Sequence, residues 1–220
     1  MFESVISARA AFTKQDLCFI ESLHGEQHSA AIRQLTQDAE SLHEILDQPD
    51  VRRALLESPV ALPVSPSFYF YTLVRHALLE SGVDHVGLTD HIAGVLANKL
   101  GRPSSFGCRG HEWATHAVDF MVRIQQASGL LKVRLEVEAG DQFLLLTGLF
   151  PDFLRERSER RGAPGVEFYG SFARQSYSHA SSHRELGPES SEIFGLLAEV
   201  FPIAQRSLNR MREHCLFLGS

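Results

Sequence analysis

The segment from about Phe68 to Glu80 is apolar on almost every side when it is drawn as a helix, and this feature constrains the fold more than any other. Such a helix is stable only when other elements cover it on several sides. Ser67 can cap its first turn, and Gly82 follows its end. The chain must therefore supply further helices that pack around this one.

Helical periodicity recurs along the chain, with apolar side chains at i, i+3 or i+4 and i+7. Residues 1–28 are weakly patterned, and the proline-rich stretch 58–66 is extended. Continuous apolar faces joined by short loops indicate a single all-α domain over residues 1–220, a bundle of seven to nine helices. The predicted helices lie at about 29–47, 50–57, 68–80, 84–100, 111–127, 141–161, 166–183 and 190–214.

Residues 131–138 alternate strictly between apolar and charged side chains, which alone is the pattern of a strand. A single strand needs a partner, and no second segment of the chain carries a convincing strand pattern. We therefore favour a helix here and keep a short strand-like hairpin edge as the alternative.

Charge, hydropathy and cysteine usage exclude several classes of protein. The formal net charge is −6, whereas proteins that neutralise many phosphates carry a basic surplus or a basic face. The longest apolar run, at 143–150, is far shorter than the roughly 20 residues that a membrane span requires. The three cysteines are widely spaced and form no Cys-x-x-Cys pair, which fits a reducing compartment. We expect a cytoplasmic protein that binds neither nucleic acid nor membrane.

His179 and His183 are the first candidates for chemistry, because they are spaced i, i+4 and fall with Ser176 on the apolar side of the helix predicted at 166–183. Two inward imidazoles need partners, and one metal ion (iron, zinc or manganese) satisfies both. The simpler interpretation is that each ring bonds to a carbonyl, hydroxyl or carboxylate in the core. The metal hypothesis requires a further ligand within about 8 Å of the imidazoles.

Glu112, His116 and Asp119 form a polar row on the helix predicted at 111–127. Carboxylate and imidazole groups in such rows are typical of helical di-iron bundles, so these residues are candidate ligands on a facing helix. The alternative is that they form the solvated face of an otherwise apolar helix.

Arg75 and His76 interrupt the apolar helix at 68–80. A buried guanidinium is always charged and needs a carboxylate or an anionic ligand. We favour a structural ion pair over a clamp for a substrate. Tyr177, close to the two histidines in the sequence, is the third candidate for a ligand contact or ion pair.

Two segments, Ser65 to Leu78 and Leu146 to Phe153, resemble parts of an uncharacterised bacterial family of all-helical proteins. The resemblance implies a bacterial, cytosolic origin. It brings no activity that could be transferred to named residues.

Two functional hypotheses follow from these observations. The first is a helical binding or regulatory protein that acts through a homo-oligomer or a protein partner. The second is a helical metalloprotein or oxidoreductase, mononuclear or resembling the di-iron proteins, that uses the histidines and carboxylates named above. Whether the protein is an enzyme is left open.

Overall fold

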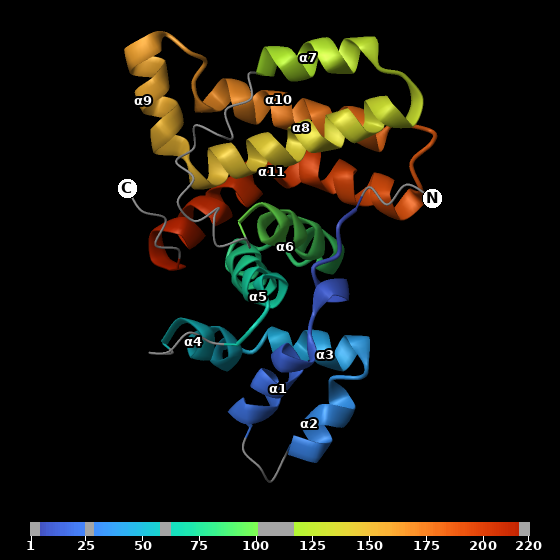
Figure 1. The fold of residues 1–220 in the computed structure, drawn as a ribbon, viewed down its shortest axis with the longest axis vertical. Helices are drawn as coiled ribbons and strands as arrows, with labels where there is room; N and C mark the ends of the chain where they lie inside the picture. The colour runs from blue at the N-terminus through green and yellow to red at the C-terminus, as the bar shows by residue number, and fades with distance from the viewer. Residues whose placement is uncertain (1–4, 25–28, 58–62, 101–116, 216–220) are drawn as a thin grey trace. The chain divides into compact units, whose positions relative to one another are not determined.

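The computed structural model of the chain describes residues 5–24, 29–57, 63–100 and 117–215. Within these ranges lie eleven α-helices, a short 3₁₀ helix and no strand, so the all-α prediction is confirmed (Figure 1). The expected number of seven to nine helices is too low. The periodic segment at 29–47 contains two separate helices, and the segment at 141–161 contains the end of one helix and the whole of the next. The sequence did not predict the helix inside the weakly patterned residues 1–28.

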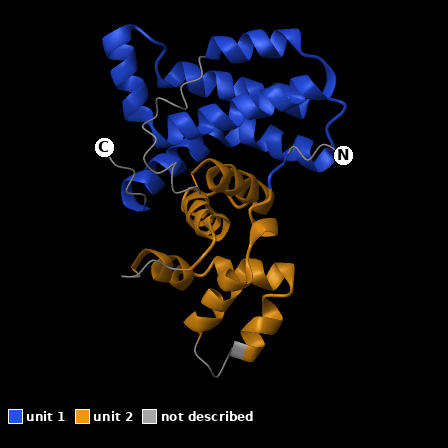
Figure 2. Ribbon diagram, viewed as in Figure 1, with its two compact units in different colours: residues 1–6, 103–220 blue, residues 7–102 orange. Residues whose placement is uncertain are grey.

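The chain divides into two compact units (Figure 2). Unit 2 comprises residues 7–102, and unit 1 comprises residues 1–6 and 103–220. The periodicity of the sequence marks no boundary between them. None of the described helices is both long and apolar enough to cross a membrane.

Unit 2 is built around α5, the helix that the sequence marks as apolar on all sides. This helix contacts α6, α4 and the 3₁₀ helix, and its side chains from Phe70 to Leu78 are all buried. The elements of unit 2 are η1 (Arg9–Ala11), α1 (Lys14–Leu23), α2 (Ser29–Leu35), α3 (Ala39–Leu46), α4 (Pro49–Glu57), α5 (Pro66–Leu79) and α6 (Val86–Leu100).

The first turn of α5 differs from the predicted one. The helix begins at Pro66, and Ser65 rather than Ser67 provides the cap, its hydroxyl accepting from the backbone N–H of Phe68 at 3.1 Å. Proline suits this position because its fixed backbone angle is helical and its missing N–H would have no partner there. The buried carboxylate of Asp16 accepts from the backbone N–H and the hydroxyl of Ser65, which joins the beginnings of α1 and α5.

Unit 1 is organised by α8, which contacts all four other described helices of the unit. Helices α8, α10 and α11 lie side by side in Figure 1, and these three pairs share the most extensive contacts of the unit. The helices are α7 (Ala117–Gln126), α8 (Gly129–Leu149), α9 (Pro151–Arg161), α10 (Val166–Ser181) and α11 (Pro188–Cys215).

Residues 131–138 form the first half of α8, so the strand-like alternative is wrong. The alternation misleads because neighbouring helices cover α8 on several sides. From Leu135 to Leu149 every side chain except that of Glu138 is buried, and the polar residues of this stretch lie inside the unit with the apolar ones.

Candidate functional site

Arg75 is the largest of the almost fully buried side chains, with 1% of its surface exposed. Its Nε and Nη2 atoms each donate to a different carboxylate oxygen of Asp47, both at 2.7 Å. Nη2 also lies 2.7 Å from an oxygen of Asp84. The forked guanidinium matches a carboxylate in this two-bond geometry, which makes the pair strong and directional.

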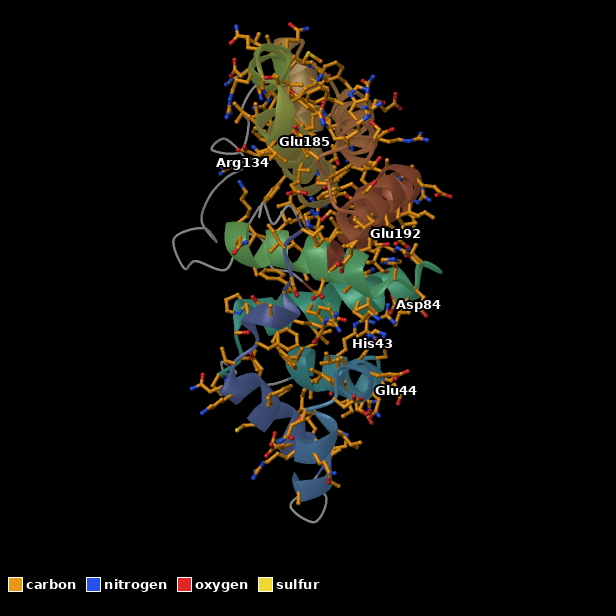
Figure 3. All side chains as sticks on the ribbon, turned by 90° about the vertical axis from the view of Figure 1, so that its right-hand side faces the viewer. His43, Glu44, Asp84, Arg134, Glu185 and Glu192 are labelled. Carbon is orange, nitrogen blue, oxygen red and sulfur yellow. The ribbon has the colours of Figure 1, made fainter. Side chains whose placement is uncertain are left out.

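His43 and Tyr71 extend this polar network. Nη2 of Arg75 lies 3.0 Å from Nε2 of His43, and because Nη2 can only donate, Nε2 is the acceptor. The neutral ring then carries its proton on Nδ1, which lies 3.5 Å from the Tyr71 hydroxyl. Burial lowers the pKa of His43, although the charge of Asp47 acts in the opposite direction. Burial raises the pKa of Tyr71 to about 12. His43 and Asp84 lie on the same side of unit 2 (Figure 3).

This network is a structural ion pair. Asp47 ends α3, Arg75 lies on α5, and Asp84 lies in the segment between α5 and α6, so the three charges join separate parts of unit 2. Two of the three guanidinium nitrogens are already bonded within the chain, and Nη1 alone is buried without a hydrogen-bond partner from the residues that the structure describes. A clamp for a substrate would need more of the guanidinium to be free.

His76 and Tyr177 are also core residues with partners in the chain. Nε2 of His76 lies 3.2 Å from the carbonyl oxygen of Leu46, to which it donates, and burial lowers the pKa of the imidazole. In unit 1, the Tyr177 hydroxyl donates to Asp141 at 2.8 Å, and burial raises the pKa of this hydroxyl well above its ordinary value. Neither ring is open to solvent.

Glu136, in the middle of α8, is the site residue that sequence reasoning missed. Only 2% of its side chain is exposed, and its Oε2 atom is buried without a hydrogen-bond partner among the described residues. Its Oε1 atom lies 3.9 Å from Nδ1 of His179, which is too far for a hydrogen bond. Burial raises the pKa of Glu136, while Lys132, His179 and His183 act in the opposite direction. We call these four residues the Glu136 cluster.

The inward orientation predicted for the two histidines is wrong for His179, because 58% of its side chain is exposed. It lies in the last turn of α10, which ends at Ser181. His183 is half-buried and lies beyond that end, in a turn where its backbone N–H donates to the carbonyl of Ala180. The helical i, i+4 geometry therefore does not apply to this pair. Ser176 is buried, as the helical wheel predicts.

The other predicted ligands do not join this cluster in the part of the chain that the structure describes. Asp119 is exposed on α7, as the alternative of a solvated face predicts, and Glu112 and His116 lie outside the described residues. No three described histidine, cysteine, aspartate or glutamate side chains are arranged to hold a metal ion.

A signal for Glu136 was available once its segment is treated as a helix. Its apolar neighbours along the helix face, at i−3, i+3 and i+4, are Val133, Ala139 and Gly140. A charged residue in such a position must be buried, and a buried carboxylate needs a partner. The strand-like alternation of the segment concealed this position.

No family model matches the chain, and neither the curated proteins nor the solved structures contain a match to it. The function must therefore be argued from the two polar clusters alone.

Proposed function

We propose that the protein is a helical binding protein and that the Glu136 cluster is its ligand site. The observation that carries this proposal is the buried Oε2 atom of Glu136, for which the described chain supplies no partner. Leaving a buried polar group unsatisfied costs about 1–3 kcal/mol, and more for a charged group. A protein keeps an unsatisfied buried group, in spite of its cost in stability, where the group is needed for function.

A comparison with Arg75 supports the choice of this cluster. Both side chains are ionisable and almost completely buried. Arg75 is bonded to two carboxylates and an imidazole, whereas Glu136 has only His179 at 3.9 Å beside it. A ligand that carries a positive charge or donates a hydrogen bond would satisfy the free oxygen. His179 is more than half exposed, so it offers such a ligand a contact on the solvent side of the cluster.

Cytoplasmic location and a homo-oligomer or protein partner belong to the same proposal. Cys18 forms no disulfide with another described residue, which fits a reducing compartment. Val118, Val122 and Leu131 are exposed apolar side chains on α7 and at the beginning of α8, and their replacement by serine would test for self-association.

The proposal is tested by replacing Glu136 with methionine, an apolar residue of similar length that favours helix. A carboxylate kept for function is dispensable for folding, so Glu136→Met should raise the free energy of unfolding by about 1–2 kcal/mol. Urea denaturation followed by circular dichroism measures the change. The control is Glu138→Met, a half-exposed position on the same helix, where we expect a change within about 0.5 kcal/mol. A loss of stability in Glu136→Met would mean that the carboxylate is structural.

A further inference from the structure

We propose that two copies of this chain associate through the exposed side of α7, with the two helices antiparallel about a two-fold axis. The contact consists of Val118 and Val122 with Asp119 and Arg123. This inference rests on the self-association that the proposed function includes, and it names the surface and the partner. It does not depend on Glu136, whose role Glu136→Met tests separately.

The side of α7 that faces away from α8 carries two apolar side chains. On the inner side, Ala117 and Phe120 are buried, and the Phe120 ring packs edge-on against Phe143 of α8. On the other side, Val118 and Val122 lie one helical turn apart and are 62% and 44% exposed. In Figure 1, α7 forms one edge of unit 1. Single exposed apolar side chains are normal on protein surfaces, so the valines alone do not mark an interface.

Two opposite charges lie beside the valines and are both available to a partner. Asp119 and Arg123 are exposed, and neither forms an ion pair with a residue that the structure describes. Their i, i+4 spacing would allow them to pair with each other. Instead, the guanidinium of Arg123 lies over the ring of Phe120, 5.8 Å from its centroid.

A two-fold axis makes this side of α7 complementary to itself. When the axis lies at the level of residue 121, residue 119 of one copy lies opposite residue 123 of the other, and this pairing occurs twice. Each Asp119 carboxylate then faces the Arg123 guanidinium of the second copy. The same axis brings Val118 of one copy within about 3 Å, along the helix, of the level of Val122 in the other. A parallel pair would instead place like charges opposite each other, which is unfavourable.

The size of this surface determines how tightly the copies bind. With 10 residues, α7 is about 15 Å long, so an interface built on it falls below the roughly 800 Å² per partner of a standard stable complex. We therefore expect a weak dimer with a dissociation constant of about 10–100 µM. Its exposed ion pairs should make association severalfold weaker when the salt concentration rises from about 0.05 M to about 0.5 M.

The experiment is sedimentation velocity of the full chain between about 5 µM and about 300 µM, a range that spans the expected dissociation constant. Asp119→Arg places guanidinium groups opposite each other, and Arg123→Asp places carboxylates opposite each other. Each variant alone should therefore associate at least about tenfold more weakly than the wild type. An equimolar mixture of the two variants restores both ion pairs, so the mixture should associate as tightly as the wild type. Only an antiparallel pairing of α7 predicts this restoration.

The control is Glu199→Arg, which makes the same change of charge as Asp119→Arg at an exposed position of α11. This variant should associate as the wild type does. Circular dichroism establishes that each variant is folded.

Three outcomes would overturn the inference. A wild type that stays monomeric over the whole concentration range would show that α7 is not a contact between copies. Association that survives in both single variants would place the contact elsewhere. A mixture that associates no more tightly than its components would exclude the antiparallel pairing. None of these outcomes bears on the Glu136 cluster, which stands or fails with the stability of Glu136→Met.

Discussion

At the scale of single residues, Arg75 and Glu136 show two ways of accommodating a buried ionisable side chain inside a helical protein. Arg75 is held by Asp47, Asp84 and His43, all within unit 2. Glu136 has no hydrogen-bonded partner at its Oε2 atom within the described part of the chain. A buried ion pair stabilises little relative to apolar packing, but removing one partner is strongly destabilising because the other charge stays buried. The two clusters should therefore respond to mutation with opposite signs.

For the arginine network, Asp47→Asn should lower the free energy of unfolding by about 3 kcal/mol, the lower end of the range for a broken buried pair, because Asp84 still neutralises the guanidinium. Urea denaturation measures the loss. Glu156→Gln is the matched control, since it removes a carboxylate from the exposed Glu156–Arg160 pair. There the change should stay within about 0.5 kcal/mol. Equal losses of stability in the two variants would show that the burial of Arg75 does not determine how much the removal of its carboxylate partner costs.

Sequence reasoning could identify Arg75 but not its partners. A charge among apolar residues at helical spacing is visible in the sequence, and so is its need for a carboxylate. Asp47 lies 28 residues away, and choosing it requires knowing that the end of α3 packs beside α5. The predicted inward orientation of His179 is wrong for a related reason. The helical wheel places it on the apolar side, but in the last turn of α10 the buried face is formed by Tyr177 and Ala180, and His179 faces solvent.

At the scale of elements, α8 shows why the type of an element and the residues at which it ends are harder to predict when a helix is buried on all sides. A helix with one solvent-exposed face shows a helical periodicity of apolar and polar residues in its sequence, whereas a helix covered on several sides does not. Gly140 and Gly148 are part of this arrangement. A Cβ atom at Gly140 would lie 2.6 Å from the ring of Tyr177, and one at Gly148 would lie 2.8 Å from Leu208. These glycines let α10 and α11 approach α8 closely.

This close approach predicts opposite effects for two glycine-to-alanine replacements inside helices. Gly140→Ala should destabilise the protein by about 1–3 kcal/mol, because the added methyl group displaces the ring of Tyr177, which is fixed by its hydrogen bond to Asp141. Gly195→Ala in α11 meets only ordinary contacts, the nearest at 3.8 Å from Ser181. This replacement should raise the free energy of unfolding by up to about 1 kcal/mol, because alanine has a higher helix propensity than glycine. Thermal or urea unfolding distinguishes them, and a stabilised Gly140→Ala would mean that α10 can move away freely.

At the scale of the whole molecule, the pH dependence of stability should reflect two histidines of unit 2, the buried His76 and the partly buried His43. Burial lowers the pKa of both His43 and His76 from the ordinary value of 6.5. Below about pH 6.5 the unfolded chain therefore binds protons that the folded chain does not. The lowered pKa of Asp47 adds a second loss of stability at lower pH. Burial would raise this pKa, but the hydrogen bonds and charge of Arg75 hold it below 3.8, so its contribution disappears as the carboxylate is protonated.

The free energy of unfolding should thus be highest near neutral pH and fall as the pH is lowered below about 6.5. His76→Gln tests the histidine contribution, since the glutamine amide can still donate to the Leu46 carbonyl but does not titrate. Urea denaturation at about pH 7.5 and about pH 5.5 should show a smaller loss of stability for this variant than for the wild type. If the two losses are equal, His76 binds its proton as readily in the folded chain as in the unfolded one. The buried imidazole would then have to be accessible to water, which contradicts its burial on α5 against the carbonyl of Leu46 at the end of α3.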